Sequence, residues 1–336
     1  MPREAADLGG YMNQMPIIDF HCDTLMECVK GVPLAKNSLH IDLEKLKKGG
    51  AMAQFFAIFI PTGECAAECG VTLPPYEYFQ QTYAAYCREL EQNSAEIAPA
   101  LCYGDILKNR EAGKLSAILT IEDGGAVLDG QLERLEEAWE KGVRLITLTW
   151  SYENCVGYPA SAALPELMDK GLKPFGMEVL HRMEELGMIV DVSHLSDGGF
   201  WDVVKLAGKP FVASHSCCRT FSKHPRALTD DMLRAIGDKG GLVGVNFCDA
   251  FLVEGGVDPV QPEDVVRHLR HMANVAGMDT PAFGSDFDGI TSHLAFENYA
   301  GMPRILAEME RQGFTPAEID KICHGNALRV IRDTMG

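Results

Sequence analysis

The amino-acid sequence predicts an α/β fold in which eight strand–helix units close into one (β/α)8 barrel, the TIM barrel. Short apolar runs rich in β-branched and aromatic residues recur along the chain, and each is followed by a longer segment with helical periodicity. There are eight such runs. Their nearly continuous apolar character is typical of strands buried on both faces, which favours a closed parallel barrel over an open sheet.

The strands and helices can be placed in order along the chain. The eight strands are expected at residues 16–20, 53–60, 115–121, 143–150, 188–193, 210–214, 241–247 and 281–285. The helices are expected at residues 76–92, 131–141, 174–186, 196–207, 229–238, 262–276, 303–312, 316–323 and 325–333. Several of them start at residues that favour helix N-termini, such as Ser196, Thr229 and Thr315.

The chain is expected to form a single catalytic domain over residues 1–336. It is 46% hydrophobic, which is enough for one large core, and no internal repeat, low-complexity tract or linker divides it. The segments 61–75, 151–173 and 248–261 are expected to be extended βα loops, whose residues shape the substrate pocket.

Composition excludes several classes of partner. The chain has 30 basic and 48 acidic residues, a formal charge of −18, and no basic cluster suited to nucleic acid. No signal peptide is recognisable and no stretch approaches the roughly 20 apolar residues that span a bilayer, so a protein without membrane contact is expected. Eleven scattered cysteines indicate reduced thiols and a cytoplasmic location. The sequence leaves open whether the chain forms a homodimer.

The carboxyl ends of the predicted strands carry the candidate functional residues. In a barrel these ends meet at one mouth, where reactive groups gather. Five of the eight ends carry His, Asp or Glu, and the candidates are His21, Asp23, Glu122, His194, His215 and Asp286. One histidine after a strand is usually an ordinary rim residue. Three imidazoles and several carboxylates at one point would instead repel or stay unsatisfied without a positive partner.

These residue types indicate a metal centre. Imidazole nitrogen mixed with carboxylate oxygen suits Zn²⁺, with manganese or cobalt as alternatives. The set exceeds the needs of one four-coordinate ion, which points to two ions per chain with a shared carboxylate. His21 and Asp23 are two residues apart and can serve one ion, while His194 and His215 would hold the second. Glu122 is the candidate bridge.

Six motifs give the chain a resemblance to the membrane (renal-type) dipeptidases, which are binuclear zinc peptidases of the amidohydrolase superfamily. They span nearly the whole chain: IIDFHCDTL near the N-terminus, TIEDGG at 120–125, IVDVSHLS at 189–196, ASHSCCRTFSKHPRALTDD at 213–231, GSDFDG at 284–289 and HGNALRVI at 324–331. The absence of recognisable signal and anchor sequences resembles a bacterial, unanchored branch of this family. The set is specific, although each motif alone is weak.

The resemblance implies roles for individual residues. It assigns His21 and Asp23 to one zinc, His194 and His215 to the other, and Glu122 to both. It also implies that Asp286 transfers the proton and that Arg226 meets the substrate carboxylate, a contact that suits a guanidinium.

Further residues are expected to shape the pocket. His224 lies beside Arg226 in the sequence and is a candidate pocket residue. Renal-type members carry a substrate-binding histidine in the segment that here reads TLTWSYEN. Trp150 stands there instead and is expected to form a wall of the substrate site, which leaves the mode of carbonyl polarisation open.

The expected activity is zinc-dependent hydrolysis of the amide bond of dipeptides by a metal-bridging hydroxide. Side-chain preference, and the acceptance of L,D as well as L,L dipeptides, are not readable from the sequence. One alternative is another amidohydrolase, such as a deaminase or a lactonase-like enzyme, because one fold hosts many chemistries. The other is a metal-stabilised barrel without catalysis, although such a barrel would have no use for Asp286.

Overall fold

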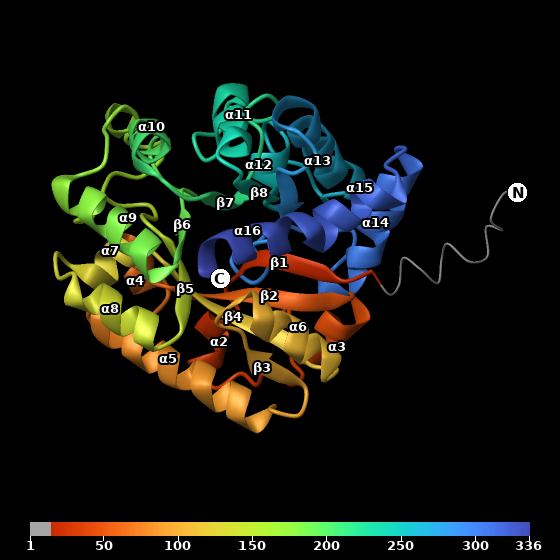
Figure 1. The fold of residues 1–336 in the computed structure, drawn as a ribbon, viewed down its shortest axis with the longest axis horizontal. Helices are drawn as coiled ribbons and strands as arrows, with labels where there is room; N and C mark the ends of the chain where they lie inside the picture. Colours follow the sequence, from red (N-terminus) through yellow and green to blue (C-terminus); the bar gives the residue numbers. More distant parts are fainter. Residues whose placement is uncertain (1–14) are drawn as a thin grey trace, which may run out of the picture.

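The computed structural model describes residues 15–336, which form a closed barrel of eight parallel strands surrounded by helices (Figure 1). The barrel strands are β1 (Ile17–Cys22), β2 (Ala51–Phe59), β4 (Leu115–Glu122), β5 (Val143–Thr147), β6 (Ile189–Asp191), β7 (Val212–Ser216), β8 (Leu242–Val245) and β9 (Pro281–Phe283). Neighbours pair in the order β2-β1-β9-β8-β7-β6-β5-β4, and pairing between β2 and β4 closes the ring. The predicted barrel is confirmed.

Helices follow the strands and cover the outside of the barrel. They are α2 (Leu25–Cys28), α3 (Leu43–Lys48), α4 (Gly63–Glu68), α5 (Pro75–Gln92), α6 (Tyr103–Glu111), α7 (Gly124–Leu128), α8 (Glu133–Glu140), α9 (Pro174–Leu186), α10 (Asp197–Leu206), α11 (Asp230–Asp238), α12 (Asp249–Leu252), α13 (Pro262–Ala276), α14 (Met302–Arg311), α15 (Pro316–Asp320) and α16 (Asn326–Met335). Three predicted caps are present, because the hydroxyls of Ser196, Thr229 and Thr315 accept a backbone N–H of the first turn.

The structure adds elements that the sequence pattern did not predict. A ninth strand, β3 (Ile97–Pro99), pairs with the start of β4 outside the ring, and α2, α3, α6 and α7 were not expected. The predicted long loops contain short helices, namely α4, a 3-10 turn at Pro165–Leu167 and α12. The two final predicted helices are joined by a π-helical turn, Lys321–Gly325.

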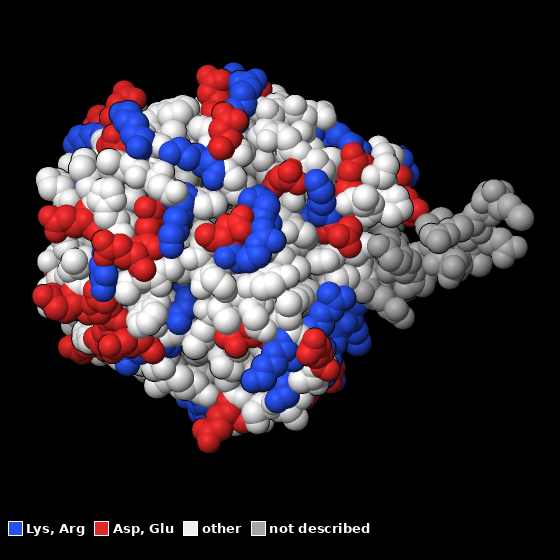
Figure 2. Space-filling view, viewed as in Figure 1, with Lys and Arg blue, Asp and Glu red and all other residues white. Residues whose placement is uncertain are grey.

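One end of the barrel is closed by an apolar plug. Ala327, Val330 and Ile331 of α16 pack in one buried cluster with strand residues such as Ile18 and Phe55. Figure 2, in the same view, shows Lys and Arg side chains interspersed with Asp and Glu on this face. Because this end is filled, polar chemistry is left to the carboxyl ends of the strands at the other end.

Across residues 15–336, no helix combines the length and the apolar character needed to cross a bilayer.

Candidate metal centre

Five of the predicted site residues come together at the carboxyl end of the barrel. His21 lies in β1, Glu122 is the last residue of β4, and His215 lies in β7. Asp23 follows β1, and His194 is three residues beyond β6. The predicted position at the carboxyl ends of the strands is confirmed, but β1, β4 and β7 extend one to two residues beyond the predicted runs, so His21, Glu122 and His215 lie inside their strands.

Glu122 lies between the other ligand candidates. Its Oε2 is 3.3 Å from Nε2 of His21, whereas its Oε1 is 2.9 Å from Nε2 of His194 and 3.4 Å from Nε2 of His215. The two histidine nitrogens on the Oε1 side are 3.0 Å apart. Each carboxylate oxygen therefore faces a different group of imidazoles.

Asp23 and Asp286 stand on the His21 side of the cluster. Asp23 Oδ2 is 3.2 Å and Asp286 Oδ1 is 3.7 Å from His21 Nε2. The other oxygen of Asp286 accepts a hydrogen bond of 2.7 Å from Nδ2 of Asn246. A side chain at Gly289 would overlap both carboxylates, so glycine is required at this position of the GSDFDG motif.

The backbone turns sharply where the strands give way to the site. Asp123, His194, Asp286 and Asp288 all have left-handed φ values, between 62° and 69°. This region is uncommon for residues other than glycine and is typical of functional sites, where surrounding contacts hold the strain. Of these four residues, His194 and Asp286 face the cluster: His194 Nε2 is 2.9 Å from Glu122 and Asp286 Oδ1 is 3.7 Å from His21.

The electrostatics of the cluster favour positive charge at its centre. Burial acts to lower the pKa of His21, but the Asp23 and Glu122 carboxylates raise it well above its usual range. Burial, with a contribution from Arg226, lowers the pKa of His194 to about 4, and burial together with His21 lowers that of His215 well below its usual range. The last two imidazoles are thus held neutral, the form that binds a metal ion.

The donor set fits divalent ions. His21, Glu122 and His215 offer atoms within 4.8 Å of one another, as do His21, Asp23 and Asp286, and all except Asp286 are fully buried. Among the described residues, Asp23 Oδ1 and His21 Nδ1 have no hydrogen-bond partner. Unsatisfied buried carboxylate and imidazole atoms are costly, and a cation bound to this mixed nitrogen and oxygen set would satisfy the carboxylate.

Arg226 lies beside the cluster, buried. Its Nη2 donates to the backbone oxygen of His215 at 3.2 Å, and its Nε has no partner among the described residues. His224 accepts the backbone N–H of Arg226 at its Nδ1, and both side chains lie against the ring of Phe251. The structure thus places His224 and Arg226 together and leaves Nε of Arg226 without a partner among residues 15–336.

Trp150 belongs to a group of aromatic rings next to His194. Its ring centroid is 4.8 Å from that of Phe59, 6.4 Å from that of Tyr152 and 6.2 Å from the imidazole of His194. The strand expected at 143–150 ends at Thr147, which leaves Trp150 in the loop at the mouth. The Tyr152 hydroxyl accepts the backbone N–H of Glu64, which joins α4 to this group.

Several polar side chains lie beneath the cluster, and of these Asp191, Ser214, Ser285 and Asn246 were not predicted from the sequence. Asp191 and Ser214 form one hydrogen-bonded pair and Asp19 and Ser285 a second, while Asn246 holds Asp286. All five are fully buried, in or just after the barrel strands. A buried polar residue inside an apolar strand motif, as in IVDVSH or GVNF, is the sequence signal that could have identified them.

Asp288 and His40 connect two loops at the mouth of the barrel. Asp288 accepts hydrogen bonds from the Thr24 hydroxyl and the His40 backbone, both at 2.6 Å. It therefore ties the β9 loop to the segment after β1. Nδ1 of His40 accepts the backbone N–H of Asp288 at 3.1 Å and so supports the same turn.

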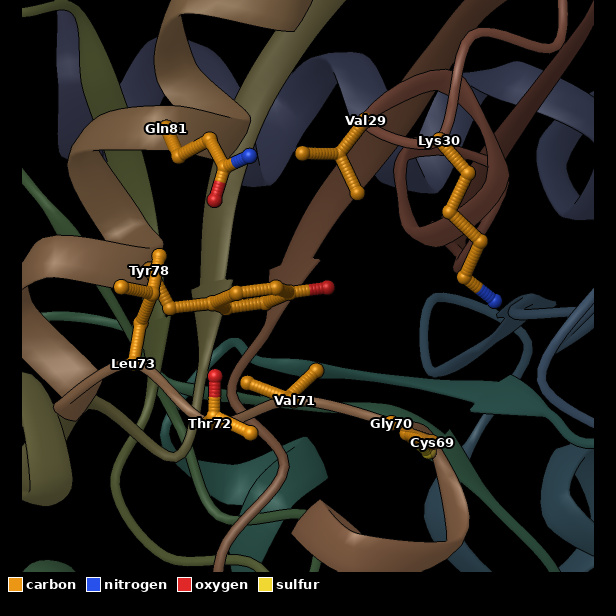
Figure 3. A pocket seen from close by; sticks show the side chains of 9 residues that line it. All are labelled: Val29, Lys30, Cys69, Gly70, Val71, Thr72, Leu73, Tyr78 and Gln81. Atoms are coloured by element: carbon orange, nitrogen blue, oxygen red, sulfur yellow. The ribbon is translucent and has the colours of Figure 1, made fainter.

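A separate cavity of about 300 Å³ lies beside α5, away from the ligand cluster (Figure 3). The Tyr78 side chain extends across it between Val29 and Val71, and the cavity has Lys30 at its edge. None of the ligand candidates lines this cavity.

Comparison with known proteins gives one consistent family. The sequence model of "Membrane dipeptidase (Peptidase family M19)" matches residues 6–335. An uncharacterized protein of Klebsiella pneumoniae is 35% identical over 263 residues, which cover 77% of this chain and 97% of that protein. An uncharacterized dipeptidase of Schizosaccharomyces pombe is 32% identical over 308 residues, covering 88% of this chain and 72% of the relative.

Solved structures share the fold over almost the full length. A metallo peptidase from Rhodobacter sphaeroides, liganded with a phosphinate mimic of the dipeptide L-Ala-D-Ala, superposes with a TM-score of 0.87 at 24% identity, covering 96% of this chain and 99% of that chain. The dipeptidase AC, a metallo peptidase of family M19, gives a TM-score of 0.86 at 25% identity with the same coverage.

Proposed function

Because the chain belongs to the membrane dipeptidase family and is therefore a peptide-bond hydrolase, we propose that it cleaves dipeptides at a centre of two divalent ions. His21 and Asp23 would hold one ion and His194 and His215 the other, with Glu122 shared between them. Zinc is the proposed metal, since a buried set of imidazoles and carboxylates without thiolate suits it.

The observation that carries this proposal is the placement of Glu122. One carboxylate oxygen faces His21 and the other faces His194 and His215, all within 3.4 Å. A carboxylate that served a single ion would not need both oxygens directed at separate imidazole groups. When bound, two divalent ions would acidify a water molecule and polarise the scissile carbonyl.

Asp286 is the proposed proton carrier. Its Oδ2 is occupied by the amide of Asn246, so Oδ1, which faces His21, is the atom free to accept a proton from the attacking water. Burial raises the pKa of Asp286, and a carboxyl group of raised pKa can also return that proton to the leaving amine. Asn246 would keep the carboxylate in this orientation.

Arg226 and Trp150 are proposed to recognise the substrate. The buried guanidinium, with Nε unpartnered among the described residues, can bind the C-terminal carboxylate of a dipeptide, which would restrict the site to short substrates. Trp150, with Phe59 and Tyr152, would form an apolar wall for a side chain. His224 would support the Arg226 segment through its hydrogen bond.

The test is turnover by zinc-loaded protein against L-Ala-L-Ala, L-Ala-D-Ala, the corresponding dipeptide amides and a simple lactone. The L,D substrate is included because a structural neighbour binds a mimic of it. We expect cleavage of free dipeptides, with the amides at least about tenfold poorer because they lack the carboxylate. Preferred hydrolysis of the lactone, or equal rates for acids and amides, would contradict the assignment.

A further inference from the structure

A chain of three buried side chains runs beneath the His194 side of the metal centre. The Ser214 hydroxyl is 2.5 Å from Oδ2 of Asp191 and 2.7 Å from Nδ1 of His215. Asp191 and Ser214 belong to the adjacent strands β6 and β7, and all three side chains have an exposed fraction of 0%. These groups are buried from bulk solvent, so the hydrogen bonds among them decide where their protons lie.

The hydrogen bonds among these three side chains run in one direction, from His215 through Ser214 to Asp191. Asp191 accepts from four donors: the Thr147 hydroxyl at 2.6 Å, the Ser214 hydroxyl, and the backbone N–H groups of Ser193 at 3.0 Å and Ser214 at 2.8 Å. A carboxylate surrounded by donors acts only as an acceptor, so it takes the one hydrogen of the Ser214 hydroxyl. Because the Ser214 hydroxyl has no second hydrogen to donate, it acts as the acceptor toward His215, which requires the proton of that imidazole to be on Nδ1.

This tautomer leaves a lone pair on Nε2 of His215. That atom faces Oε1 of Glu122 at 3.4 Å and Nε2 of His194 at 3.0 Å, where the second ion of the proposed centre would bind. Resting on the proposed function, we propose that Ser214 is a positioning residue that relays the charge of Asp191 to His215 and fixes it in the metal-binding tautomer. Partners of this kind orient ligands and raise their basicity.

The other side of the centre has a similar pair that lacks this connection. The Ser285 hydroxyl donates to Oδ2 of Asp19 at 2.6 Å, and its backbone N–H donates to Oδ1 at 2.8 Å, as at Ser214. Its remaining contacts are with the backbone rather than an imidazole: the oxygen of His21 at 3.2 Å, and the N–H of Phe287, which donates to the hydroxyl at 3.2 Å. Removing the Ser285 hydroxyl therefore breaks the same Asp–Ser bond without touching a histidine tautomer, which makes Ser285→Ala a matched control.

The direct test is the tautomer itself, read from two-bond proton–nitrogen correlations of ¹⁵N-histidine-labelled, metal-free protein. In the unmodified chain His215 is expected with its proton on Nδ1. Ser214→Ala should move it toward the Nε2–H form, and Ser285→Ala should not. An Nε2–H form of His215 in the unmodified chain overturns the proposal, and this measurement holds even if Ser214→Ala fails to fold.

Metal affinity provides the second readout. Loss of a supporting partner typically weakens metal binding by about 10- to 100-fold, and we expect a loss of that size for one ion in Ser214→Ala but not in Ser285→Ala. Equal losses in the two variants would show a purely structural role and overturn the relay. If the unmodified chain fails to bind two ions, the proposed function is contradicted. The tautomer of His215 is measured in metal-free protein, so it tests the role of Ser214 independently of that result.

Discussion

Replacing Asp286 by asparagine isolates the proton-carrying role from the geometry of the site. Asparagine has nearly the same shape and tolerates the left-handed backbone at this position, where φ is 62°. Its side-chain oxygen must take the Oδ2 position to keep the 2.7 Å hydrogen bond from Asn246. The amide nitrogen then takes the place of Oδ1, facing His21, and an amide nitrogen cannot accept a proton.

The size of the effect follows from this single change. A positioned general acid or base contributes about 10²- to 10⁴-fold, so kcat should fall by at least about a hundredfold, or about 2.7 kcal/mol in the activation free energy. Metal content should stay at the unmodified level, because the five ligand candidates are untouched.

The assay is initial-rate hydrolysis of L-Ala-L-Ala, with metal content measured on the same sample. Asp288→Asn is the matched control, since Asp288 lies in the same turn with φ at 69° but accepts hydrogen bonds from Thr24 and His40 instead of facing the ligands. We expect less than a tenfold loss of kcat in this control. Near-normal activity of Asp286→Asn would refute the role, and loss of an ion would show that Asp286 is a ligand instead.

Three further outcomes are expected. Glu122→Gln replaces one bridging oxygen by an amide nitrogen, so the chain should hold one ion or fewer and lose at least about a hundredfold in activity; two ions retained in metal analysis would contradict the bridge. Arg226→Lys keeps the charge but not the forked donors, so KM for a dipeptide should rise about tenfold or more, while a dipeptide amide is little affected; equal changes for both substrates would contradict the carboxylate contact. His268 is fully buried between the Cys218 N–H and the Leu252 oxygen, and burial lowers its pKa to about 4, below the unfolded value near 6.5. The stability that comes from burying neutral His268 is therefore present above pH 6.5 and is lost as the pH falls toward 4. The free energy of unfolding should accordingly fall by about 2 kcal/mol from pH 7 to pH 5. Urea unfolding at pH 7 and pH 5 should show a smaller drop in the free energy of unfolding for His268→Gln than for the unmodified chain. An equal drop in both proteins would contradict this role of His268.

Most of the barrel could be predicted from the sequence because buried parallel strands leave a clear signal. All eight apolar runs became barrel strands, and long amphipathic helices such as α5 and α13 agree with their predicted bounds within one residue. The short helices α2 and α7 could not be predicted, because segments of four or five residues are held by tertiary contacts and carry too little periodicity. The strand β3 pairs through only three residues, one of them proline.

The cluster of candidate ligands could be predicted for a different reason. His, Asp and Glu stand directly at the ends of apolar runs, and the barrel topology brings these ends together. Ser214 and Asn246 were not readable, since serine and asparagine are common in strands and loops, and their importance comes only from the partner on the adjacent strand. The support that His40 gives to Asp288 could not be predicted either, because this contact joins positions 248 residues apart.

The central claim is that Glu122 is shared by two divalent ions held by His21, Asp23, His194 and His215. Crystals of zinc-loaded protein, with anomalous data collected on both sides of the zinc absorption edge, test it most directly. We predict two anomalous peaks, one beside each carboxylate oxygen of Glu122. A single peak, or two peaks of which neither contacts Glu122, would contradict the account.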